Sequence, residues 1–220
     1  MSEQGSPPPL KRRRSAGRIP SPAVASSSFL ATIRSPSFWL SDGNLIVITR
    51  EVSFRVHTSV LSRNSEVFRD MLAIPQPDNA EQVEGCSVVQ LSEDGCDFET
   101  LLLALYDGGK IFGDHNVLRF RTVSAMLRLG MKYQIDLVSQ EAIRRLRKFY
   151  PNYLEDFPME YVINGRRPSV PPSIELEPED SISVVRMAIM FDLQDILVAA
   201  LYACCQLEVD TCFNAVRLGK

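Results

Sequence analysis

The chain has 220 residues, of which 45% are hydrophobic and 23% are charged, so it is long enough to bury one substantial core. Its longest unbroken apolar run, Ile196–Cys205, covers ten residues, whereas a helix that spans a membrane needs about twenty. The N-terminus has no apolar signal-peptide core, and the five cysteines show neither disulfide-framework nor metal spacing. We therefore expect a reduced, intracellular protein without a membrane span.

Charge is distributed unevenly along the chain. Residues 1–36 carry six basic side chains and one acidic side chain, whereas the remaining residues carry 18 basic and 26 acidic side chains. The N-terminal segment is also rich in Pro and Ser and has few large apolar groups. Because such a segment cannot bury enough surface to offset its ordering entropy, we predict a disordered basic tail over residues 1–36.

A basic run in this tail follows three prolines, so an import receptor could read its side chains one at a time. The nuclear-import candidates are Lys11, Arg12, Arg13 and Arg14. Ser15 is a phosphosite candidate, because the arginines before it fit a basophilic kinase; a phosphate there would add about −1.5 to −2 charges beside the run. A solvating tail explains the same residues equally well, so nucleus and cytoplasm both stay open.

Three short β-type runs are predicted after the tail. Leu45–Thr49 is apolar on both faces, which indicates a strand that is covered on both sides. Val52–His57 alternates between apolar and polar residues and follows an Arg50-Glu51 turn, so the two runs predict a hairpin. Ser87–Leu91 is predicted to be a third strand.

Apolar side chains recur with helical spacing between and after these strands. We expect Thr58 or Ser59 to cap a first short helix, and Asn64 or Ser65 to cap a second. A later helix should stop at the glycine-containing break Asp107–Gly109. The predicted helices run from Thr58 to Leu61, from Asn64 to Leu72, from Phe98 to Leu105, from Val123 to Tyr133 and from Ile135 to Phe149.

Several sequence blocks in this region resemble a known domain. They are SDGN at residues 41–44, FRVH at 54–57, T-x-V-L at 58–61, SEVFRDML at 65–72 and VVQLSEDGCDFETLLLALYDGG at 88–109. In order and spacing they resemble a BTB/POZ domain, and they are most similar to the divergent BTB proteins of basidiomycete-type fungi. The resemblance implies an α+β fold over residues 37–150, in which a helical cluster caps a small three-stranded sheet, with a C-terminal helical extension.

The resemblance also implies which residues shape the domain. His57, at the end of a strand, is expected to be buried and hydrogen-bonded and to orient the helix that follows it. BTB domains are interaction modules rather than enzymes, so the resemblance implies a non-catalytic protein that binds other proteins. The structural and interaction candidates are Asp42, Phe54, His57, Leu61, Ser65, Phe68 and Leu72.

After residue 150 the composition changes twice. Prolines and acidic residues crowd residues 151–180, which we predict to be a linker. Residues 181–220 then show helical spacing and echo an earlier segment at an offset of sixty residues, with Gln194 matched to Gln134. We interpret both segments as helical hairpins with the same turn chemistry, and we expect the second to stack on the BTB core.

The sequence contains no pattern typical of a catalytic, cofactor-binding or metal-binding site. It has two histidines, His57 and His115, and no metalloprotease, serine-hydrolase or P-loop motif. Four basic residues between positions 144 and 148 lie at a predicted helix end, where the negative end of the helix accounts for them without nucleic acid. We therefore expect no enzyme activity, cofactor, metal or small-molecule substrate, and no direct contact with nucleic acid or membrane.

Three roles stay open for such a protein. It could self-associate or recruit partners, act as a substrate adaptor for a cullin-type ubiquitin ligase, or serve as a nuclear, transcription-linked scaffold. In the family, the adaptor role usually comes with a hydrophobic-x-Glu triplet before the third strand. Here Ile74-Pro75-Gln76 has Gln in place of Glu, and Leu91-Ser92-Glu93 fits the letters but follows that strand.

Self-association in the family often uses an N-terminal helix and strand. In this chain the equivalent segment, residues 29–40, is broken by Pro36, and only Phe29, Leu30 and Ile33 could form a short apolar stripe. We therefore expect a weak homodimer or a monomer.

Overall fold

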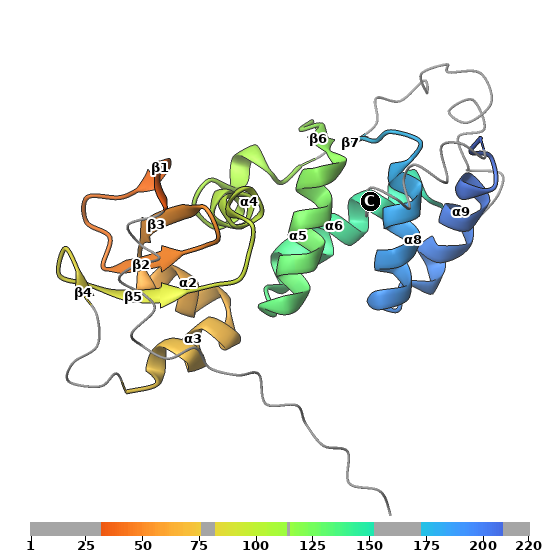
Figure 1. Cartoon of the computed structure of the whole chain (residues 1–220). Coiled ribbons are helices and arrows are strands. Elements are labelled where there is room, and N and C mark those ends of the chain that lie inside the picture. The colour runs from red at the N-terminus through yellow and green to blue at the C-terminus, as the bar shows by residue number, and fades with distance from the viewer. Residues whose placement is uncertain (1–31, 76–81, 114, 152–172, 209–220) are drawn as a thin grey trace, which may run out of the picture.

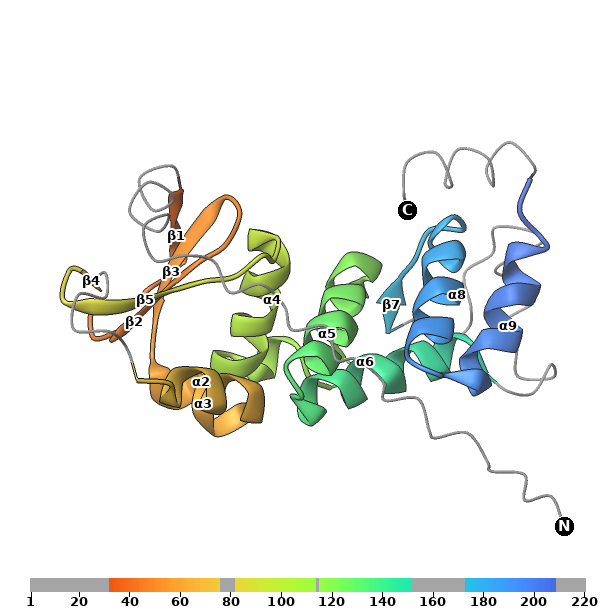
Figure 2. The same ribbon diagram turned by 60° about the horizontal axis from the view of Figure 1, so that its bottom comes forward.

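The computed structural model describes residues 32–75, 82–113, 115–151 and 173–208. The strands are β1 (Ile33–Trp39), β2 (Leu45–Ile48), β3 (Val52–Val56), β4 (Gln82–Val83), β5 (Cys86–Gln90), β6 (Leu118–Arg119) and β7 (Ile174–Glu175). The helices are α2 (Thr58–Asn64), α3 (Glu66–Ala73), α4 (Gly95–Tyr106), α5 (Phe120–Lys132), α6 (Asp136–Phe149), α8 (Asp180–Met190) and α9 (Gln194–Cys204), with a 3₁₀ turn at Gly108–Lys110. The main sheet lies at one end of the molecule and α9 at the other, with α4, α5, α6 and α8 between them (Figures 1 and 2).

The predicted α+β class is confirmed, but the main sheet has five strands rather than three. Its order is β1-β3-β2-β5-β4. The three predicted strands form its centre: β2 pairs antiparallel with β3 and parallel with β5. The sequence missed β4 because it is only two residues long and pairs Gln82 and Val83 with the beginning of β5.

Strand β1 crosses the predicted tail boundary at residue 36, so residues 33–36 were wrongly assigned to the tail. It pairs parallel with β3, and its Ser35 and Phe38 are buried, at 1% and 6% exposure. Ile33, named as part of a short apolar stripe, lies in this strand and is 75% exposed. Only two of its seven residues are buried, and Pro36 is tolerated because an edge strand leaves one side unpaired. The import run and the phosphosite candidate lie outside the described residues.

Two helix N-caps were each predicted as one of two residues: neither candidate caps the first helix, and one of the two candidates caps the second. Helix α2 has His57 at its N-cap, which makes no side-chain capping bond, so neither Thr58 nor Ser59 caps it. Ser65 caps α3 as predicted, since its side-chain oxygen accepts the N–H of Phe68 at 3.0 Å. Helix α4 ends at Tyr106, immediately before the predicted glycine break.

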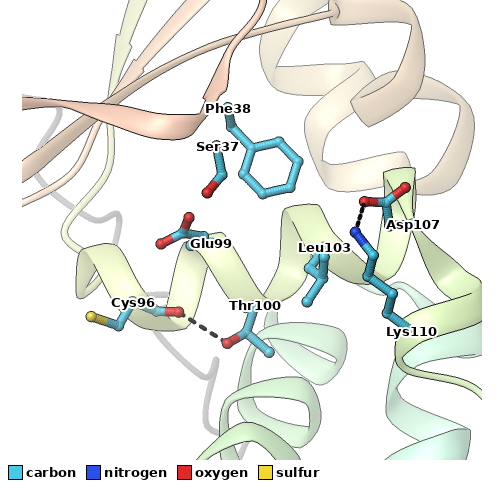
Figure 3. A pocket seen from close by; sticks show the side chains of 8 residues that line it. All are labelled: Ser37, Phe38, Cys96, Glu99, Thr100, Leu103, Asp107 and Lys110. Carbon is cyan, nitrogen blue, oxygen red and sulfur yellow. Dashed lines mark hydrogen bonds and ion pairs between the residues drawn. The ribbon is translucent and has the colours of Figure 1, made fainter.

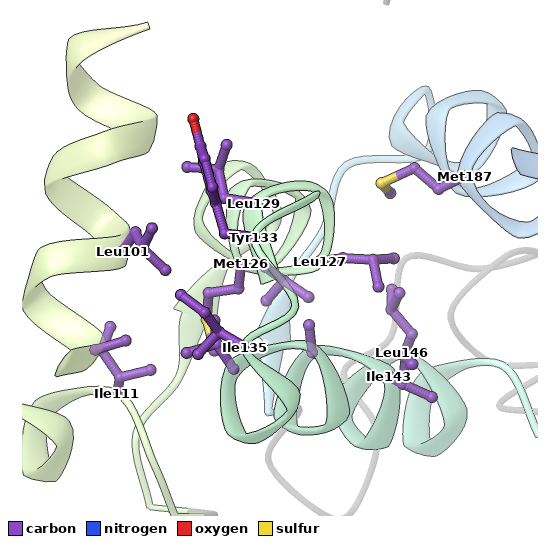
Figure 4. Packing of buried hydrophobic residues seen from close by; sticks show 14 of the residues in the cluster. Leu101, Ile111, Met126, Leu127, Leu129, Tyr133, Ile135, Ile143, Leu146 and Met187 are labelled. Carbon is purple, nitrogen blue, oxygen red and sulfur yellow. The ribbon is translucent and has the colours of Figure 1, made fainter. Parts of the chain in front are cut away.

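Aromatic side chains join the sheet to α4, and they join α3 to the end of α5. Phe54 of β3 meets Phe98 of α4 edge-on, with ring centroids 5.4 Å apart. Phe68 of α3 stacks on Tyr133 at 4.4 Å. The other face of β2 is covered by a smaller cluster around Ile46, which confirms that this strand is buried on both sides. The large core continues from α4 into α5 and α6 (Figure 4).

The end of the predicted linker is part of the fold. Strand β7 pairs parallel with β6, which precedes α5. Ile174 is fully buried and Leu176 is 7% exposed. The prediction of a linker was wrong here, because a two-residue pairing between segments more than fifty residues apart produces no periodic pattern of apolar residues in the local sequence. Residues 152–172 lie outside the described part of the chain.

The hairpins α5–α6 and α8–α9 have turns of the same geometry, but the predicted alignment of one hairpin sequence on the other is wrong by two residues. Gln134 and Asp192 are the non-glycine residues with positive φ at the two turns, at 53° and 56°. They correspond at an offset of 58 residues, not sixty. The position of the left-handed residue therefore sets the alignment, whereas the shared glutamine does not. None of the helices in the described residues is long and apolar enough to cross a membrane.

The packing of α3 and α4 generates a stability prediction. Phe68 and Leu102 are fully buried, so Phe68→Ala and Leu102→Ala should each lower the free energy of unfolding by about 2–5 kcal/mol. Leu137→Ala is the control, because this side chain is 63% exposed. Urea denaturation measures all three variants, and unchanged midpoints for both core variants would contradict the packing.

Candidate interaction site and its framework

His57 joins three elements at one end of the sheet. Its ring Nδ1 lies 3.1 Å from the Tyr106 hydroxyl oxygen, and its backbone N–H donates to that oxygen at 2.9 Å. Its Nε2 lies 3.3 Å from a carboxylate oxygen of Asp42. Burial raises the pKa of the Tyr106 hydroxyl. The His57 side chain is half-buried rather than buried, and it links the end of β3 and the start of α2 to the end of α4.

Most of the other predicted site residues belong to the framework rather than to the surface. Phe54, Leu61 and Phe68 are fully buried. Ser65 is also buried, and its hydroxyl donates to the backbone carbonyl of Tyr133 at 2.6 Å, which ties α3 to the end of α5. Leu72 is partly buried against the core. Asp42, whose side chain is 80% exposed, is the member of the set most open to a partner.

A buried guanidinium, which sequence reasoning misassigned, connects α6 to two distant segments. The Arg145 side chain has 0% exposure. Its Nη1 donates to the carbonyls of Asn116 at 2.7 Å and Ser173 at 2.6 Å. Its Nη2 donates to the carbonyls of Ile111 and Gly113, both at 2.8 Å. All of these acceptors are backbone oxygens, so the group closes the segment after α4 and the segment before β7 onto one helix.

The fifth N–H donor of Arg145 binds a carboxylate that also binds the adjacent residue, Arg144. Arg145 Nε donates to Glu141 Oε1 at 2.8 Å, and Arg144 donates to both oxygens of the same group at 2.8 Å. Burial raises the pKa of Glu141, but the hydrogen bonds and charges of the two arginines outweigh it and hold that pKa below its usual value. The helix-end explanation was therefore wrong for Arg145. Its place on the buried stripe with Val138 and Ala142 was the signal that could have found it.

A seam of ion pairs fixes α5 against the start of α4 and the turn before it. Arg128 donates to a carboxylate oxygen of Asp97 at 2.7 Å. Glu93 pairs with Lys132 and accepts the Tyr133 hydroxyl at 2.9 Å. Burial and then the Glu93 charge raise the pKa of Tyr133. Because Glu93 is engaged in this seam, Leu91-Ser92-Glu93 does not present a free carboxylate to a partner.

The other candidate for the adaptor triplet, Ile74-Pro75-Gln76, begins with an exposed side chain. Ile74 is the C-cap of α3 and is 58% exposed. The glutamine at its third position, Gln76, lies outside the described residues. Nowhere in the described part of the chain do three His, Cys, Asp or Glu side chains come together in a group that could hold a metal ion.

A cleft of about 450 Å³ opens between β1 and α4 (Figure 3). Phe38 and Leu103 supply its apolar walls, and Lys110 is paired with Asp107 at 2.8 Å. Among the described residues Glu99 has no ion-pair partner, so this cleft combines apolar surface with one unneutralised carboxylate. The lining residues are Ser37, Phe38, Cys96, Glu99, Thr100, Leu103, Asp107 and Lys110.

Comparison with known protein families identifies this architecture. The BTB/POZ domain family matches residues 39–149, about half of the chain. The chain belongs to the BTB/POZ family. A search of curated proteins found no match to it. The match ends at the last residue of α6, so Arg145 lies inside the BTB domain, whereas its acceptor Ser173 and the α8–α9 hairpin lie beyond it.

The Arg145 contacts predict how much stability the protein loses when this side chain is replaced. Arg145→Met would leave four backbone carbonyls, one buried and three partly buried, and part of the Glu141 carboxylate without their donor, so it should lower the free energy of unfolding by about 3–5 kcal/mol. Arg147→Met is the matched control: its ion pair with Asp195 is half-exposed, so its loss should cost less than about 1 kcal/mol. Equal urea midpoints for the two variants would show that the buried contacts do not stabilise the fold.

Proposed function

We propose that this BTB protein is a non-catalytic interaction module that recruits a protein partner. The observation that carries the proposal is the cleft between β1 and α4. It fits a partner segment that presents a basic side chain to Glu99 and an apolar side chain to Phe38 and Leu103. The outer edge of β1 lies beside it, where an extended segment could pair with the sheet.

Recruitment is favoured over self-association by strand exchange. Strand β1 is already paired with β3 of its own chain, and Ser35 and Phe38 are buried there. An exchange of this strand between two copies would re-form the same pairing and the same burial in the partner, so it adds no contact that the single chain lacks. The N-terminal strand therefore serves as a wall of the binding cleft.

A cullin-adaptor role is the second candidate, and Ile74 favours it. Its exposed side chain lies at the end of α3, and the triplet that it begins precedes the third predicted strand, as the adaptor triplet of the family does. Gln76 can accept hydrogen bonds as glutamate does, but it lacks the charge. This difference predicts weaker cullin binding than a glutamate would give.

A nuclear, transcription-linked scaffold is the third candidate, and it rests on the basic run at Lys11–Arg14. In that role the BTB core would recruit other proteins that contact DNA. The similarity to basidiomycete-type proteins stays a prediction that rests on the sequence blocks alone.

Affinity purification of the full chain from its native cells, with quantitative mass spectrometry, tests recruitment. Glu99→Lys should reduce the principal partner by about tenfold or more, because it reverses the charge inside the cleft. Ile74→Asp should remove cullin subunits if the adaptor role holds, and Leu137→Asp is the exposed control on α6. A partner set unchanged by Glu99→Lys would contradict the cleft, and absence of cullin from the unchanged protein would contradict the adaptor role.

Nuclear import is tested separately from partner binding. Residues 1–36, fused to a fluorescent protein too large to diffuse through the nuclear pore, should accumulate in the nucleus because the four basic side chains are read by an import receptor. The matched control carries Ala at Lys11, Arg12, Arg13 and Arg14 and should stay cytoplasmic. The same cytoplasmic distribution for both fusions would end the import proposal.

A further inference from the structure

The cleft between β1 and α4 contains a carboxylate that lacks a counter-ion among the described residues. Glu99 lines this cleft and is partly buried. The other two charged side chains that line it, Lys110 and Asp107, neutralise each other at 2.8 Å. Because a partly buried carboxylate gains most from a charge-assisted hydrogen bond, the cleft favours an occupant that carries a cation.

The two walls of the cleft also require an apolar side chain. Ser37 and Phe38 of β1 lie opposite α4, with Glu99 on the side of Ser37 and Leu103 on the side of Phe38 (Figure 3). The charged and the apolar parts of the cleft are therefore neighbours. An occupant that fits both parts presents one cation and one large apolar side chain on the same side of its backbone.

The chain itself contains a segment with this chemistry, before the described residues. Residues 1–31 carry five basic residues and one acidic residue, whereas the rest of the chain carries 19 basic and 26 acidic residues. Among those five, Arg12 alone has a large apolar residue, Leu10, two positions away. Side chains two residues apart lie on the same side of an extended backbone. The prolines at positions 7–9 favour an extended backbone before Leu10.

This segment is tethered beside the cleft by its own chain. It leads into β1, which begins at Ile33 and supplies Ser37 and Phe38 to the cleft. Four strand residues cover about 13 Å, whereas the eighteen residues between Arg14 and Ile33 can reach up to about 60 Å. A tether of this kind gives an effective concentration on the order of millimolar, so even a weak contact would be occupied.

The other basic pair outside the described residues, Arg166-Arg167, fits the cleft less well. No large apolar residue lies two positions before or after either arginine. The segment that contains them joins α6 to β7, and neither of these elements lines the cleft. The N-terminal segment is therefore the better match in both chemistry and connection.

We propose that the N-terminal segment of the same chain occupies this cleft, with Arg12 at Glu99 and Leu10 against Phe38 and Leu103, and competes there with the partner. This inference rests on the proposed recruitment by the same cleft, and it adds the regulation of that site. A partner has to displace the segment, so its apparent affinity falls in proportion to the fraction of molecules whose cleft is open.

Zero-length cross-linking of the full chain with a carbodiimide tests the contact. Lys11→Arg with Arg12→Lys keeps the charge and moves the amine to position 12, where it should form an amide with the Glu99 carboxylate. Mass spectrometry of mixed isotopically light and heavy protein should show this link within single chains. Adding Glu99→Gln should remove the link, and adding Glu177→Gln, which replaces an exposed carboxylate after β7, should not. Absence of the link, or a link only between light and heavy copies, would overturn the proposal.

Fluorescence anisotropy measures the competition without any partner. The probe is a labelled synthetic peptide of residues 6–19, titrated with the full chain. A variant with Ser at positions 11–14 should bind the probe at least tenfold more tightly than the unchanged protein, because its own segment no longer holds the cleft. Adding Glu99→Lys should abolish this binding, whereas adding Glu177→Lys should not. Equal affinity of the unchanged protein and the Ser variant, or no binding to either, would overturn the proposal. Circular dichroism and the urea midpoint confirm that each variant is folded.

These two measurements separate the intramolecular contact from recruitment. Neither of them uses a partner, so both can fail while Glu99→Lys still removes the principal partner in the affinity purification. That result would overturn this inference alone. A partner set unchanged by Glu99→Lys would contradict recruitment, and the competition with it, but it would leave the cross-link and the peptide affinities as they are.

Discussion

The buried guanidinium of Arg145 is the interaction on which the arrangement of the C-terminal half depends. A buried cation is costly unless every donor is satisfied and its charge is paired. Here the acceptors come from α6 itself, from the segment after α4 and from Ser173. They meet only when α6, the end of α4 and the segment before β7 are all in place. The α8–α9 unit is therefore attached to the BTB domain as a continuation of its fold.

Sequence reasoning recovered the elements whose side chains have a strong local period. The five helices up to residue 149 and the three central strands follow from amphipathic, alternating or continuously apolar patterns, and the BTB blocks supplied their topology. It missed β1, since only Ser35 and Phe38 of that strand are buried, and it missed β7, because a two-residue pairing is decided by tertiary contacts. Arg145 was misassigned because a basic residue near a helix end has the same local sequence whether it is solvated or buried. Of the predicted site residues, the structure leaves Asp42 exposed and places most of the others in the framework.

The central claim is that Arg145 couples the C-terminal unit to the BTB domain, and hydrogen exchange measured by mass spectrometry tests it most directly. Exchange of the native protein is compared with that of Arg145→Met under conditions where both stay folded. The account predicts that the amides near Ile111, strand β7 and helices α8 and α9 lose protection together, while β2 and β3 keep theirs. Full protection of α8 and α9 in the variant would contradict the account, because the hairpin would then be held in place without the guanidinium.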